Sequence, residues 1–452
     1  GSGYLTKCTL LFDGLRSKEA CVFSLCAPGC LFCWRVPGFA RSDRFMVPDL
    51  FTLVADQCAA TSDRIAIEQG ERALTYGELD QRVHVVADRL RTMGVEPGTC
   101  CAVSVARPLE AMVGFLAVLK IGAFYLPLDQ NLPRQRKRLL IEETNTKFLV
   151  TAAGNGDREL AVETCEIDLD QQSSSTASAS FTDQVRGSGP AYVIYTSGST
   201  GHPKGVKVSR DNLVYSTLAR HSYYREPVRK FLLVSPLTFD SSVAGIYWTL
   251  TTGGTLVFPE VPINHNVAAI AQSIGRSGVS HLLCIPSLWN LLLNDLKDES
   301  LHALESVIVA GEACPRQLAQ RHHERLSDTA LYNEYGPTEA TVWCSVHQVT
   351  ADDADRKVPI GKPIDGTKIY LLDADQRFVP PDTEGELYVS GPGVALGYVG
   401  DPQLTADRFL PDPFVGGQSR MYKTGDFGRM SIDGSVTFLG RHDGQLLSLI
   451  HI

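Results

Sequence analysis

The stretch that most constrains the fold is an apolar run followed directly by a glycine-rich loop. Residues 191–195 (Ala-Tyr-Val-Ile-Tyr) have the composition of a buried strand, and residues 196–205 (Thr-Ser-Gly-Ser-Thr-Gly-His-Pro-Lys-Gly) follow them. The three glycines allow tight backbone turns, and the amides, hydroxyls and Lys204 together make a cradle for an anion such as phosphate. Lys204 precedes a glycine and a valine, so the loop does not match the pattern G-x-x-x-x-G-K-[ST]. We therefore predict a phosphate-binding loop of another kind.

From Val47 to about residue 345, strand-like and helix-like segments alternate. Apolar residues at helical spacing predict a helix near 50–58, and Thr75 is placed to cap a helix over 77–93. Expected strands are 65–68, 73–76, 101–105, 123–128, 231–235, 256–258 and 281–285, and further helices are 110–121, 245–250 and 267–277. This alternation predicts a layered α/β domain with mostly parallel sheets.

From Val358 the pattern changes to short strands separated by Gly, Pro and Asp turns, as at 369–372, 386–389 and 436–439. These strands predict either a small β-barrel or a distorted sheet. We therefore divide the chain into a leader (1–46), an α/β core (47–345), a β-rich, barrel-like subdomain (346–440) and a short tail (441–452).

The leader differs in composition from the rest of the chain. It holds Cys26, Cys30 and Cys33, whose spacing is typical of the iron–sulfur ligands of radical S-adenosylmethionine enzymes. Such enzymes need alternating strands and helices immediately downstream, but residues 34–46 are mixed and basic, and a different domain begins after them. We interpret residues 1–46 as a disordered or non-native leader rather than as a cluster site.

Composition argues against two classes of partner. A net charge of −9 disfavours nucleic acid, and the basic residues at 134–138 lie at the spacing of a solvated helix face. No apolar run approaches the roughly 20 residues needed to cross a bilayer, and the first residues lack the pattern of a signal peptide. We expect a cytoplasmic protein with no nucleic-acid or membrane partner.

Seven further motifs accompany the glycine-rich loop in a fixed order. They are LTYGEL (74–79), LKIGAFYLPLD (119–129), FDSS (239–242), NEYGPTE (333–339), GEL with GY (385–387 and 397–398), YKTGD (422–426) and GRHD (440–443). With these motifs, residues 47–445 resemble the large N-terminal core of adenylation domains of nonribosomal peptide synthetases. Those domains belong to the adenylate-forming superfamily of acyl-CoA synthetases and firefly luciferase. The resemblance implies the same α/β fold with its smaller β-rich subdomain.

The resemblance also implies a reaction, in which ATP and an amino acid give aminoacyl-AMP and pyrophosphate. Such chemistry needs mainly positioning and charge stabilisation. The residues implied at the phosphates are Thr196, Ser197, Gly198, Ser199, Thr200, Gly201 and Lys204. Glu339 is implied as the ligand of Mg²⁺, which prefers hard oxygen ligands shared with phosphates. Of these residues, Lys204, Thr196 and Glu339 carry the implied catalytic roles.

The nucleoside is implied to contact residues of three motifs. Tyr335 stacks on adenine with Asn333 and Gly336 beside it, Thr338 touches the α-phosphate, Asp426 accepts hydrogen bonds from both ribose hydroxyls, and Arg441 lies against the ribose and phosphate. Tyr335 as a core residue and Asp426 as a turn cap remain the structural alternatives.

Asp240 separates the subfamilies, because in amino-acid-activating members the aspartate after Phe239 pairs with the substrate's α-ammonium. The implied pocket for the substrate side chain is Ser241, Ala244, Leu283, Ile308, Ala310, Glu334, Val342 and Trp343. Glu334 is its one potential charge; it either meets a basic or hydroxyl-bearing side chain or faces solvent or backbone. We expect a large side chain, aromatic or cationic. Gly245 stands where an acidic residue is common in the family.

The end of the chain departs from the family. Asp443 resembles the hinge before a mobile C-terminal subdomain that supplies a lysine, but residues 447–452 match nothing in the family. We expect a truncated core with impaired turnover; the intact system would load a peptidyl carrier protein through its phosphopantetheine thiol. Two alternatives stay open: an acyl- or aryl-CoA ligase, and a catalytically inactive nucleotide-binding module. The latter is disfavoured if Lys204, Glu339 and Asp426 converge.

Overall fold

The structure is a computed structural model that describes residues 49–154, 160, 162–169, 189–196, 202–224, 226–260, 267–296 and 302–441. The chain divides into two compact units, 1–42 and 43–452, and every described residue belongs to the second. The leader (1–46), the loop residues 197–201 and the predicted hinge Asp443 lie outside the described residues.

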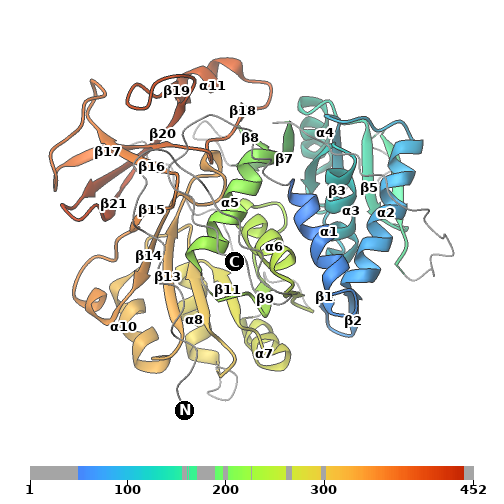
Figure 1. Ribbon diagram of the computed structural model, residues 1–452, viewed down its shortest axis with the longest axis horizontal. Coiled ribbons are helices and arrows are strands. Elements are labelled where there is room, and N and C mark those ends of the chain that lie inside the picture. The colour runs from blue at the N-terminus through green and yellow to red at the C-terminus, as the bar shows by residue number, and fades with distance from the viewer. Residues whose placement is uncertain are drawn as a thin grey trace, which may run out of the picture. The chain divides into compact units, whose positions relative to one another are not determined.

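A nine-stranded sheet forms the larger part of the α/β core (Figure 1). Its strands, in spatial order, are β15 (Lys362–Pro363), β14 (Ser345–Val349), β13 (Ala330–Tyr335), β12 (Ser306–Val309), β11 (His281–Cys284), β9 (Lys230–Leu233), β10 (Thr255–Phe258), β1 (Ile65–Gln69) and β2 (Arg72–Thr75). The strands from β13 to β1 are parallel, and the pairs at the two edges are antiparallel. The parallel centre follows from the strand–helix alternation of the sequence.

A second, seven-stranded sheet carries the glycine-rich loop. Its order is β18 (Gly397–Tyr398), β8 (Lys204–Ser209), β7 (Pro190–Thr196), β4 (Phe124–Leu128), β3 (Cys100–Ser104), β5 (Phe148–Ala152) and β6 (Glu163–Ile167). The five strands from β7 to β6 are parallel, whereas β8 and β18 run antiparallel to their neighbours.

In both of these sheets, neighbouring residues of central strands belong to different cores, so each sheet is covered on both faces. Phe231 and Leu233 of β9 join the central core, but Leu232 between them joins an outer core. The central core includes residues of α1 (Leu50–Ala60), α2 (Tyr76–Thr92), α3 (Pro108–Lys120), α5 (Arg210–Tyr223) and α6 (Asp240–Thr252) and of both sheets. The outer layers are α7 (Val267–Ser277), α8 (Pro286–Asp295) and α10 (Arg316–Arg325) on the nine-stranded sheet, and α4 (Arg134–Glu143) on the other.

Local sequence signals explain how two of the central helices begin and pack. Thr75 caps α2 as predicted, since its hydroxyl accepts from the Glu78 amide while the Glu78 carboxylate accepts from the Thr75 amide. Gly245 lets α6 lie close on β9, because an added Cβ there would come 2.4 Å from a Phe231 ring carbon. The absence of an acidic side chain at 245 therefore follows from helix–strand packing.

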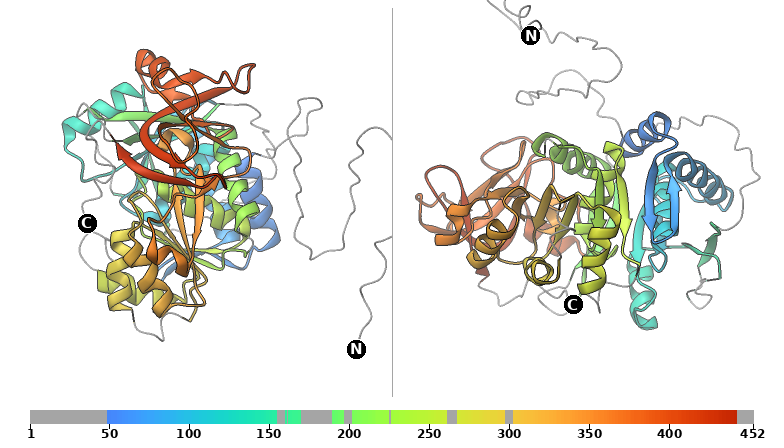
Figure 2. Two further views of the ribbon diagram at one scale, coloured as in Figure 1. Left: turned by 90° about the vertical axis from the view of Figure 1, so that its left-hand side faces the viewer. Right: turned by 90° about the horizontal axis from the view of Figure 1, so that it is seen from below.

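The third sheet is antiparallel and open. It comprises β16 (Lys368–Leu372), β17 (Glu384–Ser390), β20 (Arg420–Met430) and β19 (Phe409–Pro411), with β21 (Val436–Arg441) also paired to β20. Of the two predicted alternatives, the distorted sheet is the one observed, because the described strands close no barrel. These strands form their own group beside the nine-stranded sheet in the views of Figure 2.

The change of sheet does not fall at the predicted boundary near residue 346. β14 and β15 still belong to the nine-stranded sheet, and β18 returns to the seven-stranded one. The short elements η3 (Thr338–Ala340), η4 (Ala351–Asp355) and α11 (Pro402–Arg408) connect these parts. Among the described residues, no helix is both long and apolar enough to cross a membrane.

Candidate functional site

The two described ends of the glycine-rich loop lie side by side. β7 ends at Thr196 and β8 begins at Lys204, and these two residues are partners in the antiparallel ladder. Gly205 is required next to them, because an added Cβ would come 2.8 Å from the Tyr195 ring. The ladder therefore fixes the hydroxyl of Thr196 and the ammonium of Lys204 at one end of the same pair of strands.

Lys204 lies in a cluster of cations and tyrosines contributed by the far end of the chain. Its Nζ is 5.8 Å from the centroid of the Tyr398 ring, and the Tyr398 hydroxyl donates to Glu339 at 2.7 Å. Partial burial and then the charge of Arg408 lower the pKa of Lys204, with Arg441 acting in the same direction and Glu339 against it. Several cations within electrostatic reach of one another favour a bound anion.

Asp426 and Arg441 lie on adjacent strands, β20 and β21, as an ion pair. Arg441 Nη1 donates to Asp426 Oδ1 at 3.0 Å, and the Tyr335 hydroxyl donates to Oδ2 at 2.5 Å. Burial raises the pKa of Asp426, while the hydrogen bond from Tyr335 and the charge of Arg441 oppose that rise. Asp426 and Arg441, which are implied at the ribose, therefore lie against Tyr335, which is implied at adenine.

Glu339 connects the predicted groups. Its negative charge acts on the pKa of Lys204, of Asp240 and of Asp426. The structure thus gathers Lys204, Glu339 and Asp426 in one region. Glu339 is buried, and it lies in the short helix η3, which begins at Thr338 shortly after the end of β13.

Among the described residues, no group of three or more His, Cys, Asp or Glu side chains forms a metal cluster. A single carboxylate beside a phosphate loop still fits Mg²⁺, which is commonly held by one or two carboxylates and substrate phosphates.

Asn333 and Gly336 of the NEYGPTE motif contribute to the packing of the fold. The Asn333 amide is buried and donates to the Pro359 carbonyl at 2.8 Å, so it ties β13 to the segment before β15. Gly336 admits no side chain, because an added Cβ would come 2.4 Å from the Trp343 Cα. Tyr335 packs with its ring centroid 6.0 Å from that of Phe438.

Asp240 begins helix α6 directly after Phe239, which is exposed. Burial raises the pKa of Asp240 to about 6; a hydrogen bond with Thr338 lowers it and the charge of Glu339 raises it further. A carboxyl held in this environment gains most from a cationic partner. The implied ammonium partner and the implied α-phosphate contact, Thr338, are therefore neighbours.

The residues implied around the substrate side chain gather on one face of the nine-stranded sheet. Ala244, Leu283, Ile308 and Trp343 belong to the same central core, and Val342 packs against it. Ser241 and Ala310 are half-buried at the ends of α6 and β12. The structure thus brings the implied lining together from helix, sheet and loop.

Glu334 differs from its predicted role. Its two carboxylate oxygens accept from Arg220 Nη1 and Nη2 at 2.6 and 2.8 Å, and Oε1 also accepts from the Tyr224 hydroxyl at 2.5 Å. Arg220 and Tyr224 were missed by sequence reasoning, although their four-residue spacing at the end of α5 places them on one helix face. Glu334 therefore offers no unpaired charge, and a cationic substrate side chain loses its predicted partner.

A strained turn holds Val342 and Trp343 in place. Thr341 and Val342 have φ of 58° and 78°, and a β-branched residue rarely adopts such values. The Trp343 amide donates a hydrogen bond to the Thr341 carbonyl at 3.0 Å, and the Ser216 hydroxyl donates to the same carbonyl at 2.9 Å. These two hydrogen bonds hold the turn. The Trp343 indole in turn donates to the Ser216 carbonyl at 3.2 Å. Ser216, on α5, is a third residue that sequence reasoning missed.

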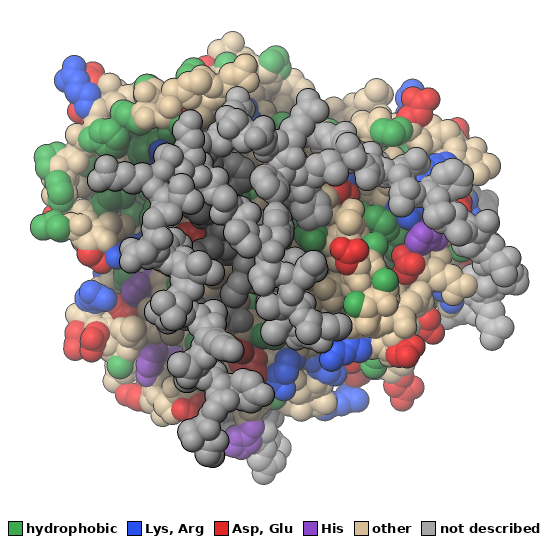
Figure 3. Space-filling model, viewed as in Figure 1, with side chains coloured by type: hydrophobic (Ala, Val, Ile, Leu, Met, Phe, Trp, Pro, Cys, Tyr) green, Lys and Arg blue, Asp and Glu red, His purple; other side chains and the backbone are tan. Residues whose placement is uncertain are grey.

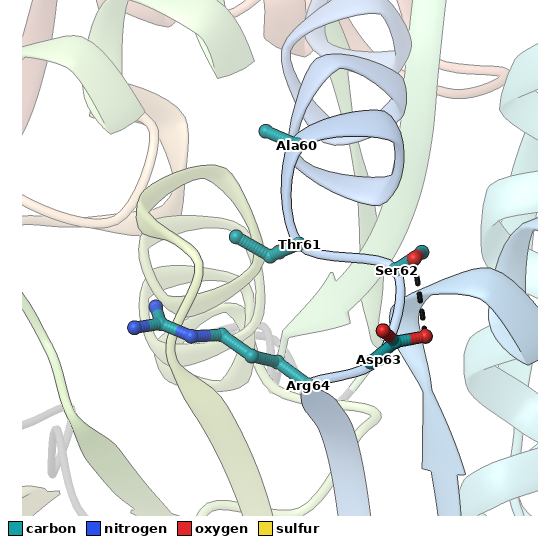
Figure 4. Close-up of a pocket in the computed structure, with 5 residues that line it drawn as sticks. All are labelled: Ala60, Thr61, Ser62, Asp63 and Arg64. Atoms are coloured by element: carbon teal, nitrogen blue, oxygen red, sulfur yellow. Dashed lines mark hydrogen bonds between the residues drawn. The ribbon is translucent and has the colours of Figure 1, made fainter. Parts of the chain in front are cut away.

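Two hollows in the described part of the chain lie away from the residues named above, and one of them is lined by residues between Gly94 and Phe148. The hollow in Figure 4 is lined by Ala60, Thr61, Ser62, Asp63 and Arg64 in the connection between α1 and β1, and it contains none of the residues named above. On the face drawn in Figure 3, acidic side chains are interspersed with basic ones.

Comparison with known proteins assigns the family. Residues 54–399 match the pattern of the family "AMP-binding enzyme". Bacitracin synthase 3 of Bacillus licheniformis is 38% identical over 397 residues, which cover 87% of this chain and 6% of that protein. Phosphinothricin tripeptide synthetase PhsB of Streptomyces viridochromogenes is 36% identical over 401 residues, which cover 87% of this chain and 34% of that protein. The chain thus spans 6% and 34% of the length of these two relatives. This protein belongs to the AMP-binding enzyme family.

Solved structures narrow the likeness to adenylation domains. The nonribosomal peptide synthetase FmoA3 (S1046A), in its α-methyl-L-serine-AMP bound form, superposes with a TM-score of 0.81 and 31% identity over 89% of this chain and 46% of that one. Holo-PA1221, a nonribosomal peptide synthetase protein with adenylation and PCP domains, superposes with a TM-score of 0.79 and 28% identity over 88% of this chain and 69% of that one. The fold is that of the adenylate-forming enzymes.

Proposed function

We propose that this protein activates an α-amino acid with ATP, forming aminoacyl-AMP and pyrophosphate for nonribosomal peptide synthesis. The observation that carries the proposal is the place of Asp240, whose half-buried carboxyl interacts with Thr338 and Glu339, next to the cluster around Lys204. This arrangement suits a ligand with an ammonium at one end and phosphates at the other. The bound α-methyl-L-serine-AMP of the similar FmoA3 structure agrees with it.

In this proposal each residue has one task. Lys204 and Thr196 hold the departing phosphates, and Glu339 would hold Mg²⁺, which would neutralise charge on them. Asp426 and Arg441 position the ribose, and Tyr335 packs on the adenine. Asp240 binds the α-ammonium and so orients the carboxylate toward the α-phosphate.

A carrier protein is the proposed recipient of the aminoacyl group, through the thiol of its phosphopantetheine. The support is indirect: solved structures such as PA1221 combine an adenylation domain with a PCP domain. The site described above explains adenylate formation only, so the carrier remains part of the proposal.

The test is a thermal-shift panel of non-hydrolysable aminoacyl-adenylate analogues, one for each amino acid. Ligand at a hundred times its dissociation constant should stabilise the protein by about 2.7 kcal/mol, a shift of some degrees. Asp240→Ala should abolish this response. Asp211→Ala is the matched control, because Asp211 lies in the first turn of the neighbouring helix α5 and is exposed. No response in a protein that melts cooperatively would contradict the proposal.

An acyl- or aryl-CoA ligase is the alternative within the same fold. It predicts a response to adenylate analogues that lack the amine, and no effect of Asp240→Ala on that response. A carboxyl left unpaired beside an amine-free ligand would be costly, so we expect those analogues to bind poorly.

A further inference from the structure

One ion pair behind the substrate site is not explained by adenylate chemistry. Arg220 and Glu334 have side chains only 1% and 2% exposed, and they face each other through two parallel hydrogen bonds. Glu334 belongs to the implied lining, whereas Arg220 comes from α5, outside it. The pair therefore introduces a second, opposite charge into a site where sequence predicted a single carboxylate.

The environment holds Arg220 in this position. Its guanidinium carbon lies 4.3 Å from the centroid of the Trp343 ring and 5.8 Å from that of Trp248, both of which are buried. Contacts of a guanidinium with aromatic rings are attractive, and the fork geometry matches a carboxylate. Nη1 and Nη2 of Arg220 both donate to Glu334, whereas its Nε has no hydrogen-bond partner among the described residues.

The pair changes which side chains the site can accept. A substrate ammonium or guanidinium would approach a carboxylate whose oxygens already accept three hydrogen bonds, next to a buried cation of the same sign. A substrate carboxylate would find the Nη donors of Arg220 directed to Glu334. Like charges in a poorly solvated site repel strongly, and an unpaired buried charge is costly. An uncharged side chain meets neither cost.

We propose that Arg220 is a specificity-determining residue that neutralises Glu334, so that the site selects an α-amino acid with an uncharged side chain. The inference rests on the proposed function and narrows its substrate class. It also replaces the expectation of a cationic substrate with one that excludes it.

The test uses the same analogue panel with the full chain and two variants. The wild-type protein should respond to one or a few analogues with uncharged side chains and not to the lysyl, ornithyl, arginyl, aspartyl or glutamyl ones. Arg220→Met leaves the Glu334 carboxylate without its cation, and affinity for the lysyl or ornithyl analogue should rise at least about tenfold relative to the preferred uncharged one. The double variant Arg220→Met with Glu334→Gln should lose that gain and keep the wild-type order.

Several outcomes would overturn the inference. A wild-type protein that prefers a charged analogue contradicts it, and so does an Arg220→Met variant that folds without gaining affinity for the cationic ones. If Arg220→Met does not fold, the wild-type panel and the double variant still test the inference. A double variant that gains affinity for the lysyl analogue would refute it, because the Glu334 carboxylate is absent from that variant. Failure of the proposed function is distinct: no aminoacyl analogue of any kind would bind to a protein that still binds AMP.

Discussion

Two clusters in this molecule have the same chemical composition and different surroundings. In each, an arginine pairs with a carboxylate that also accepts a hydrogen bond from a tyrosine at 2.5 Å: Arg220, Glu334 and Tyr224 in one, Arg441, Asp426 and Tyr335 in the other. The first is bidentate with both charged side chains almost fully buried, whereas in the second a single contact of 3.0 Å joins Asp426 to an arginine that is 12% exposed.

The difference teaches how one set of groups serves two purposes. In the closed cluster around Glu334 every carboxylate oxygen is committed to the fold, so a ligand meets a neutral surface. In the open cluster around Asp426 the arginine is partly exposed and makes one hydrogen bond to the carboxylate, so ribose hydroxyls can join the present donors. We therefore expect the closed cluster to contribute mainly to stability and selectivity, and the open one to affinity for the nucleotide.

The largest expected effect is on stability. Arg220→Met should lower the free energy of unfolding by about 3–5 kcal/mol, because it leaves a buried carboxylate without its cation. Arg441→Met should cost less, about 1–2 kcal/mol, since Arg441 makes one hydrogen bond to Asp426 and is itself partly exposed, whereas Arg220 makes two to Glu334 and is buried. Urea denaturation of the three proteins measures both values. A greater loss in Arg441→Met would reverse the comparison.

Nucleotide affinity should respond in the opposite order. Asp426→Asn should weaken AMP binding about 10- to 100-fold, because hydrogen bonds to a charged acceptor contribute about 1.5–3 kcal/mol. Glu334→Gln should change it less than about twofold. Isothermal titration calorimetry on folded variants checks both. Equal losses would mean that the two clusters do not differ in function.

A pH dependence should distinguish Asp240 from both clusters. With a pKa raised to about 6, its carboxyl is mostly protonated at pH 5 and mostly ionised at pH 7. Only the ionised form attracts an ammonium, so affinity for the preferred aminoacyl analogue should rise about tenfold from pH 5 to pH 7. Asp240→Asn should bind weakly and with little pH dependence. A wild-type affinity that stays constant over this range would argue against the proposed ammonium contact.

The smallest expected effect concerns the strained turn beside the closed cluster. Ser216→Ala removes the hydrogen bond to the Thr341 carbonyl and should cost about 1 kcal/mol of stability. It should also change the relative response to side chains of different size, while AMP binding stays the same. Ser216→Thr keeps a hydroxyl and serves as the conservative control. An altered AMP affinity in Ser216→Ala would show that the turn acts on both sides of the site.

Local patterns predicted much of the architecture, because strand and helix periodicity reflects burial on one or two faces. The helix predicted at 267–277 matches α7, and the cap at Thr75 is as expected. The predicted boundary near 346 did not coincide with a change of sheet, since β14 and β15 are antiparallel edge strands that sequence alone does not assign to a particular sheet.

The sequence likewise predicted some of the site residues and missed others. Motif order indicated Lys204, Glu339, Asp240 and Asp426, and the structure places them near one another. The Arg220–Glu334 pair joins residues 114 positions apart, and no local pattern encodes such a contact. The positive φ of Val342 runs against the preference of a β-branched residue, so only the tertiary contacts of Ser216 and Gly393 explain it.

The pairing of β18 with β8 has a consequence for synthesis of the chain. β8, directly after the glycine-rich loop, lies next to the edge of its sheet, and Tyr398 and Gly397 pair with Val206 and Lys207 there. A nascent chain emerges in order, so this edge stays uncovered on the ribosome until residues far downstream have been made. During that interval the strand is open to pairing with another chain, and a protein arrested before β18 should be prone to aggregation.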